Sequence, residues 1–124
     1  MLTMDNYRKG WALRYLREAK AELTAAQKTP YLAPGLVLEA IRKAQVAIYY
    51  SFGEPSFIEV IVHQTLQRNQ LIKDPILRFL VEIERTVQQI ARTPRLEGDK
   101  VIEQVDDLIQ LASEIVELFT GESA

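Results

Sequence analysis

The chain has 124 residues, a formal net charge of -2 and no cysteine. This length suits a single domain, residues 1–124, that removes roughly two-thirds of its unfolded surface from water. A hydrophobic fraction of 48% with 26% charged residues excludes a disordered chain, and the missing cysteines exclude disulfides, thiolate metal sites and a cysteine nucleophile.

Five prolines divide the chain into segments. Proline is tolerated in the first turn of a helix but disrupts its interior, so these positions mark helix ends. Between them, apolar residues recur at spacings of three and four, which indicates amphipathic helices. We therefore predict an all-α fold, a compact and mostly up-down bundle of about five helices. The prolines are Pro30, Pro34, Pro55, Pro75 and Pro94.

The first predicted helix covers residues 5–28. Its apolar seam contains several alanines, whose small side chains let a neighbouring helix approach closely. Trp11 and Tyr15 widen this seam, and each has a polar atom for the margin of the bundle. The seam consists of Ala12, Leu16, Ala19, Leu23 and Ala26.

The second predicted helix, residues 35–52, is the most apolar and is expected to be central. Its predicted buried stripe is Val37, Ile41, Ala44, Ile48 and Phe52. Its outer line runs through Glu39, Arg42, Val46 and Tyr49, so the second half of the helix offers little that requires water. Two interpretations stay open for this line: a subunit interface, or burial beneath another helix of the same chain.

Gly53 is predicted to end the second helix in a left-handed conformation. The third helix then starts either with Ser56 in a capping box that includes Glu59 or with Pro55 at the first helical position, and it runs to residue 69. Its predicted buried side is Phe57, Ile58, Ile61, Val62 and Leu66.

The fourth helix is predicted to begin at Asp74-Pro75, an N-cap acceptor followed by proline, and to end at Thr93-Pro94. The fifth runs from Gly98-Asp99 to Gly121. The predicted stripe of the fourth helix is Ile76, Leu80, Ile83, Val87 and Ile90. That of the fifth is Val101, Val105, Leu108, Ala112, Ile115 and Phe119, flanked by Ile102, Ile109 and Val116.

The longest uncharged runs, residues 29–38 and 44–53, have ten residues each, whereas a membrane span needs about 20. No basic segment followed by an apolar one is visible at the N-terminus, so we expect a cytoplasmic protein without membrane contact. Charge is uneven: residues 5–28 carry a net +3 and residues 99–124 a net -6. These are either two solvated faces or two ends that attract each other, within one chain or between subunits.

Candidate chemistry is sparse. His63 lies four residues after Glu59, but one histidine and one carboxylate are too few for a metal site, and we predict no metal and no cofactor. Glu103-x-x-Asp106, with Glu82 and Glu84, invites comparison with all-α nucleotide pyrophosphohydrolases, which bind magnesium through carboxylates. The match is incomplete, since residues two apart on a helix point to different faces. A solvated acidic face also explains these residues, and the enzyme is the remote alternative.

The first helix also carries a basic segment interleaved with aromatic residues. Such a pattern is a candidate contact for RNA or nucleotides, although bundle packing accounts for the aromatic residues more simply. The candidate nucleic-acid residues are Arg8, Arg14, Arg17 and Lys20.

Two segments of the first half carry alanine and leucine at helical spacing: Tyr15-Leu16-Arg17-Glu18-Ala19 with Leu23 and Ala25-Ala26, and Ala40-Ile41-Arg42-Lys43-Ala44-Gln45-Val46-Ala47-Ile48. This pattern resembles the HEPN domain family of small helical bundles, which are often dimeric and many of which belong to toxin–antitoxin or defence systems. Active HEPN ribonucleases carry Arg-x(4–6)-His. The matching positions before His63 are Ser56, Phe57 and Ile58, so the resemblance implies a non-catalytic member that binds itself or a partner.

The leading prediction is a non-enzymatic helical-bundle domain that self-associates or docks to a protein partner. The candidate interface residues are Arg42, Val46 and Tyr49. The first alternative is a HEPN-like nucleotide- or RNA-binding module that uses the basic first helix. The remote alternative is the magnesium-dependent pyrophosphohydrolase.

Overall fold

Five helices form the described part of the chain, residues 5–29, 33–68, 71–92 and 98–122 of a computed structural model. They are α1 (Asn6–Lys28), α2 (Ala33–Phe52), α3 (Pro55–Arg68), α4 (Pro75–Arg92) and α5 (Gly98–Thr120). Those residues contain no strand, which confirms the prediction of an all-α bundle of five helices.

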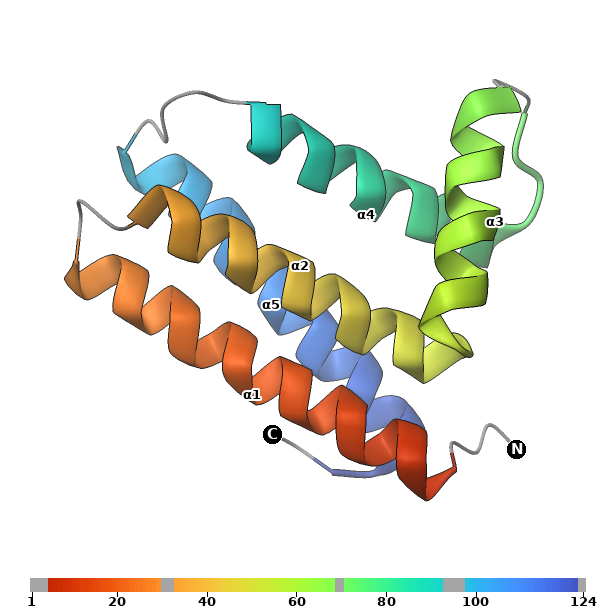
Figure 1. The fold of residues 1–124 in the computed structure, drawn as a ribbon, viewed down its shortest axis with the longest axis horizontal. Helices are drawn as coiled ribbons and strands as arrows, with labels where there is room; N and C mark the ends of the chain where they lie inside the picture. The colour runs from red at the N-terminus through yellow and green to blue at the C-terminus, as the bar shows by residue number, and fades with distance from the viewer. Residues whose placement is uncertain (1–4, 30–32, 69–70, 93–97, 123–124) are drawn as a thin grey trace.

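Helices α1, α2, α4 and α5 run along the long direction of the molecule and alternate in direction, whereas α3 stands across one end (Figure 1). Helix α2 contacts all four other helices, so its predicted central place is confirmed. The up-down arrangement therefore holds for four helices, and α3 is the exception.

The helix ends follow the expected capping chemistry in most places. The Asp5 carboxylate accepts a hydrogen bond from the Arg8 backbone N–H at 2.7 Å, and the Asp74 carboxylate accepts one from the Ile76 N–H at 2.8 Å. Gly121, with φ 75°, takes the left-handed conformation that closes α5. Helix α2 begins two residues earlier than predicted, because Pro34 is accommodated in its first turn.

The turn between α2 and α3 differs from the prediction. Gly53 does not have a positive φ. A side chain at this position would instead lie 3.2 Å from Ile58 Cδ1, so glycine lets α3 pack closely over the end of α2. Helix α3 starts at Pro55, the second of the two predicted starts, and the Glu54 carbonyl accepts the Ile58 N–H at 3.1 Å.

Small residues form much of the core. Because an alanine has no side chain beyond Cβ, helices lined with alanine approach closely and their backbones pack tightly. The predicted seam of α1 is entirely buried, as is the α2 stripe except for the half-buried Phe52. The fully buried alanines, at 0% exposure, are Ala12, Ala19, Ala40, Ala44, Ala47 and Ala112.

Three parts of the core prediction were wrong. On α3 the buried line is Val62 with half-buried Ile58 and Leu66, while Phe57 and Ile61 face away from the bundle. On α4, Ile76 in the first turn is exposed. On α5 the buried line contains two residues expected only to flank it, so the helix is rotated relative to its predicted stripe. The buried residues of α5 are Val105, Ile109, Ala112 and Val116.

Two isoleucine substitutions test this core. Ile41 is fully buried on α2, so Ile41→Ala is expected to lower the free energy of unfolding by about 2–5 kcal/mol through lost burial and a cavity. Ile76→Ala, at an exposed position, is expected to change it by less than about 1 kcal/mol. Urea denaturation followed by circular dichroism measures both, and equal effects would contradict this assignment of the core.

Candidate functional site

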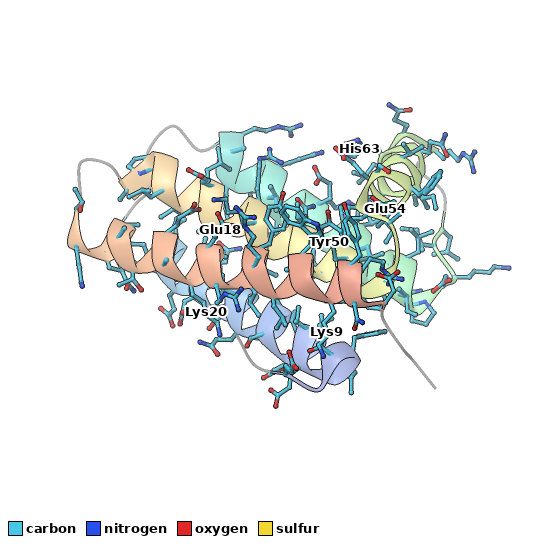
Figure 2. All side chains as sticks on the ribbon, turned by 60° about the horizontal axis from the view of Figure 1, so that its bottom comes forward. Lys9, Glu18, Lys20, Tyr50, Glu54 and His63 are labelled. Atoms are coloured by element: carbon cyan, nitrogen blue, oxygen red, sulfur yellow. The ribbon has the colours of Figure 1, made fainter. Side chains whose placement is uncertain are left out.

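A groove lies where α3 crosses α2 and α4, with a volume of about 400 Å³. Helix α2 lines it with Arg42, Gln45, Val46 and Tyr49. Helix α3 adds Pro55, Glu59 and His63, and α4 adds Glu84 and Gln88. Figure 2 shows His63 on α3, the helix that forms one wall of this groove.

The carboxylate of Glu84 is the most unusual group in the groove, since its residue is only 5% exposed. Gln45 Nε2 donates a hydrogen bond to Glu84 Oε1 at 2.7 Å, and Gln88 Nε2 donates one to Oε2 at 2.8 Å. Gln45 Nε2 also lies 3.0 Å from the hydroxyl of Tyr49. Neutral amides therefore hold a carboxylate that burial alone would strongly disfavour.

His63 is the nearest group that can carry a positive charge toward Glu84. Its Nε2 lies 3.8 Å from Glu84 Oε2, and its side chain is about half exposed at the rim of the groove. Protonation of His63 would create an ion pair between α3 and α4. His63 thus lies at the margin of the bundle, and its carboxylate neighbour at this distance is Glu84 on α4.

The predicted divergence of Glu82 and Glu84 is also confirmed. Glu82 is exposed and pairs with Arg85 Nη1 at 2.7 Å, whereas Glu84 turns into the groove. Within the described residues, no group of three or more histidine, cysteine, aspartate or glutamate side chains could hold a metal ion.

Burial raises the pKa of Tyr49 well above its ordinary value of about 10, and the negative charge of Glu84 raises it further. The hydrogen bond from Gln45 and the charge of Arg42 act in the opposite direction but are weaker. Tyr49 therefore keeps its O–H proton at neutral pH and can donate it to a bound group.

A second hollow of about 330 Å³ adjoins the groove and shares His63 and Gln88 with it. Leu66 and Gln67 complete its lining. The hollowed surface thus continues along α3 toward its C-terminal end.

The line of interface candidates on α2 lies at this groove. Tyr49 is only 4% exposed, Val46 is half-buried and Arg42 is exposed, and all three line the groove. Neighbouring helices of the same chain therefore cover Tyr49. A role for this line in contacts between subunits stays a prediction.

The face of α3 that points away from the groove is apolar. Phe57 is 71% exposed, Val60 53% and Ile61 49%. These residues stand at spacings of three and four, so they form one continuous patch on the helix. Sequence reasoning assigned two of them to the core because the helix has apolar residues on two sides.

The basic candidates on α1 are mostly engaged within the chain. Arg8 Nε donates to the Tyr50 carbonyl at 3.0 Å. Arg14 pairs with Glu18 at 3.5 Å and lies 5.0 Å from the centre of the Trp11 ring. Arg17 is exposed.

Lys9 and Lys20 both point from α1 toward α5 (Figure 2). Lys20 Nζ donates to Ser113 Oγ at 3.3 Å, and Lys9 Nζ pairs with Glu122 at 3.1 Å. The oppositely charged ends of the chain therefore meet at least once within one molecule. An exposed pair of this kind contributes little stability.

A cluster of charges joins α1 to α2. Lys43 Nζ lies 3.6 Å from Glu18 and 3.1 Å from Glu39, and it hydrogen bonds to Glu22. The pKa of Lys43 is raised, mainly by this hydrogen bond to Glu22. The pKa of Glu22 is also raised, mainly by burial of its carboxyl group. The hydrogen bond from Lys43 lowers the pKa of Glu39. The cluster acts as a link between two packed helices.

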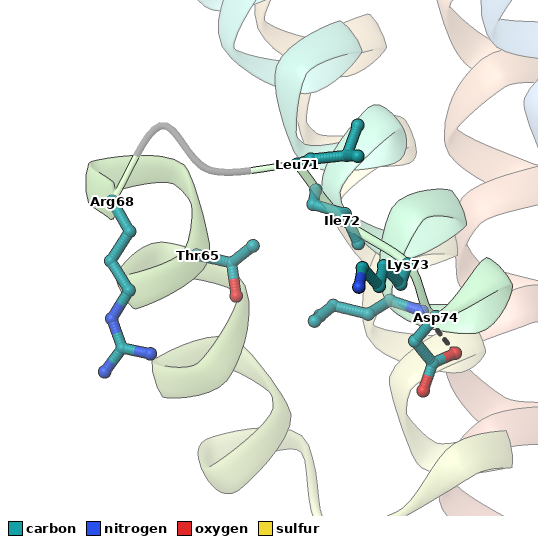
Figure 3. A pocket seen from close by; sticks show the side chains of 7 residues that line it. Thr65, Arg68, Leu71, Ile72, Lys73 and Asp74 are labelled. Carbon is teal, nitrogen blue, oxygen red and sulfur yellow. Dashed lines mark hydrogen bonds between the residues drawn. The ribbon is translucent and has the colours of Figure 1, made fainter.

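A smaller hollow of about 170 Å³ lies beside residues 71–74, between the end of α3 and the start of α4 (Figure 3). Asp74 is its acidic residue, but the Asp74 carboxylate already caps α4, and its contact to the Leu77 N–H at 3.4 Å is drawn in Figure 3. Arg78 Nη2 donates to the Ile72 carbonyl at 2.8 Å. These contacts stabilise the local backbone conformation where α4 begins.

The chain matches no protein-family model, no curated protein and no solved structure. None of the described helices is long and apolar enough to cross a bilayer.

The raised pKa of Tyr49 predicts a pH dependence. Above about pH 10 the unfolded chain loses the Tyr49 proton while the folded chain keeps it, so the free energy of unfolding should fall as the pH rises. Below about pH 10, the contribution of Tyr49 to the free energy of unfolding is fully present. Urea denaturation between pH 8 and pH 11 should show a shallower fall for Tyr49→Phe than for the parent protein. Tyr7→Phe, at an exposed position, serves as the control, and parallel curves for all three proteins would contradict the assignment.

Proposed function

We propose that this protein is a non-enzymatic, cytoplasmic interaction module that self-associates through the outer face of α3. The main support for this proposal is the exposed apolar patch of Phe57, Val60 and Ile61. A contiguous apolar surface of this kind is costly in water and is typical of contact sites between proteins.

The spacing of α3 favours another helix as the occupant. Glu54, Ile61 and Arg68 are seven residues apart, and Phe57 and Gln64 lie between them at the spacings of a heptad seam. All five residues are exposed. A second helix laid along this line would cover the two large apolar side chains with polar groups at both ends.

The charges at the two ends favour a second copy of this chain. Glu54 precedes the first residue of α3, and Arg68 is its last residue. In a two-fold symmetric pair with α3 helices antiparallel, Glu54 of each copy faces Arg68 of the other, because residue i meets j and j meets i. The antiparallel arrangement also pairs opposite ends of the two helix dipoles.

Charge insertion tests the apolar part of this interface. Phe57→Glu and Ile61→Glu should each convert the dimer to a monomer in sedimentation equilibrium, since a carboxylate would be buried without a partner. Leu118→Glu replaces an apolar residue on α5 that is about as exposed as Phe57, and it should leave the dimer intact. A parent protein that is monomeric at high concentration would refute the proposal.

A charge exchange tests the orientation. Glu54→Arg alone should weaken the dimer, because it places two arginines together at each end. Glu54→Arg combined with Arg68→Glu should restore the affinity, since the pairs are re-formed with reversed sign. Additive losses in the double variant would contradict the antiparallel arrangement.

A second candidate function is RNA or nucleotide binding by a HEPN-like module. Its support is a row of aromatic rings on α1, with ring centres 6.3 Å apart for Tyr7 and Trp11 and 5.9 Å apart for Trp11 and Tyr15. Arg14 lies 5.0 Å from the centre of the Trp11 ring, and both Arg14 and Arg17 are exposed. Aromatic rings beside arginine are the usual platform for stacked bases.

Salt dependence separates this candidate from the first. If RNA binds α1, its affinity should fall with rising salt, and Arg14→Glu or Arg17→Glu should weaken it about tenfold. Fluorescence anisotropy with single-stranded RNA measures this. Absence of binding at low salt would dismiss the candidate.

A further inference from the structure

We propose that the groove between α2, α3 and α4 binds a small organic cation that carries N–H donors on an apolar body, of the amidinium or guanidinium class. The proposal concerns the surface opposite the outer face of α3, and it does not depend on self-association.

The carboxylate of Glu84 has unused acceptor capacity. A carboxylate offers about four lone-pair directions, and the structure assigns one amide donor to each oxygen, Gln45 at 2.7 Å and Gln88 at 2.8 Å. Both donors are neutral. A planar cation with two parallel N–H groups matches the remaining lone pairs and supplies the positive charge that the buried carboxylate lacks.

The charge of the whole lining also favours a cation. Glu84 and Glu59 contribute two negative charges and Arg42 contributes one positive charge, so the lining is net negative while His63 is neutral. Because Glu84 is 5% exposed, its field acts in a medium of low dielectric constant and is weakly screened. An anion would meet the opposite situation and should be excluded.

The size of the groove and its apolar lining favour a cation that carries an apolar body. A volume of about 400 Å³ is larger than a bare amidinium requires and falls within the usual range of about 300–1,000 Å³ for ligand pockets. Val46, Pro55 and the ring of Tyr49 offer apolar surface beside the carboxylate. A cation joined to an aromatic or aliphatic group fills this space better than a small ion.

Arg42 provides a test with a distinctive sign. It is exposed at the rim and carries the same charge as the proposed ligand. Removing it should therefore strengthen cation binding, whereas removing a residue that merely stabilises the fold would weaken it. Arg42→Gln is expected to raise the affinity several-fold.

Three probes of similar shape separate charge from donor capacity. Isothermal titration calorimetry at pH 7.5 is expected to show binding of benzamidine in the millimolar range or tighter, roughly -4 kcal/mol or better. Benzoate, an anion of nearly the same shape, should not bind. Benzyltrimethylammonium, a cation without N–H donors, should bind about tenfold more weakly than benzamidine.

Two carboxylate variants locate the site. Glu84→Gln should weaken benzamidine binding at least about tenfold, because a neutral amide replaces the charge. Glu82→Gln, two residues away on the exposed side of α4, should not change it. If Glu84→Gln does not fold, the sign of the Arg42→Gln effect decides the question. Benzamidine that fails to bind at roughly 10 mM, benzoate that binds equally well, or a folded Glu84→Gln with unchanged affinity would overturn the proposal. A weaker or unchanged affinity in Arg42→Gln would also overturn it.

Discussion

The fold depends on one constraint, the covering of α2 by the rest of the bundle. This helix contacts every other helix, and ten of its 20 residues are buried. Its fully buried alanines permit close packing, whereas the buried amide of Gln45 requires polar partners, which Glu84 on α4 and the hydroxyl of Tyr49 supply. The need to satisfy these groups places α4 over α2 in one register. The groove exists because α3 crosses the end of this pair and closes one side of it.

Helix α3 takes part in both proposed sites, the dimer interface on its outer face and the cation groove on its inner side. It has 14 residues and is apolar on two sides. The inner line of Val62, with Ile58 and Leu66 beside it, packs on the bundle, while Phe57, Val60 and Ile61 of the outer patch remain about half or more exposed among the described residues. In the proposed dimer a second copy covers this patch, and the inner side of α3 shapes the groove.

The sequence predicts this structure best where periodicity and helix punctuation agree. The α1 seam and the Asp74-Pro75 start were correct for that reason. Apolar spacing does not give the orientation of α3, because a helix with apolar residues on two sides does not show which side faces inward. The prediction that Phe57 and Ile61 are buried was wrong for this reason. The groove also could not be predicted, since Gln45, His63 and Glu84 come from three different helices and meet only through tertiary packing. A glutamate among core positions of α4 was the available signal, because such a residue is rarely buried without partners.

The central claim is that α3 forms a two-fold interface. The most direct test is the distance between spin labels on two copies of the chain. The chain has no cysteine, so a single spin label can be attached at Ser56→Cys on α3 or at Thr24→Cys on α1. A 14-residue helix is about 21 Å long and packed helices lie about 8–10 Å apart. The account therefore predicts that pulsed electron resonance shows an intermolecular distance below about 30 Å for the α3 label and a longer distance for the α1 label. The reverse order, or no dipolar signal from either label, would contradict it.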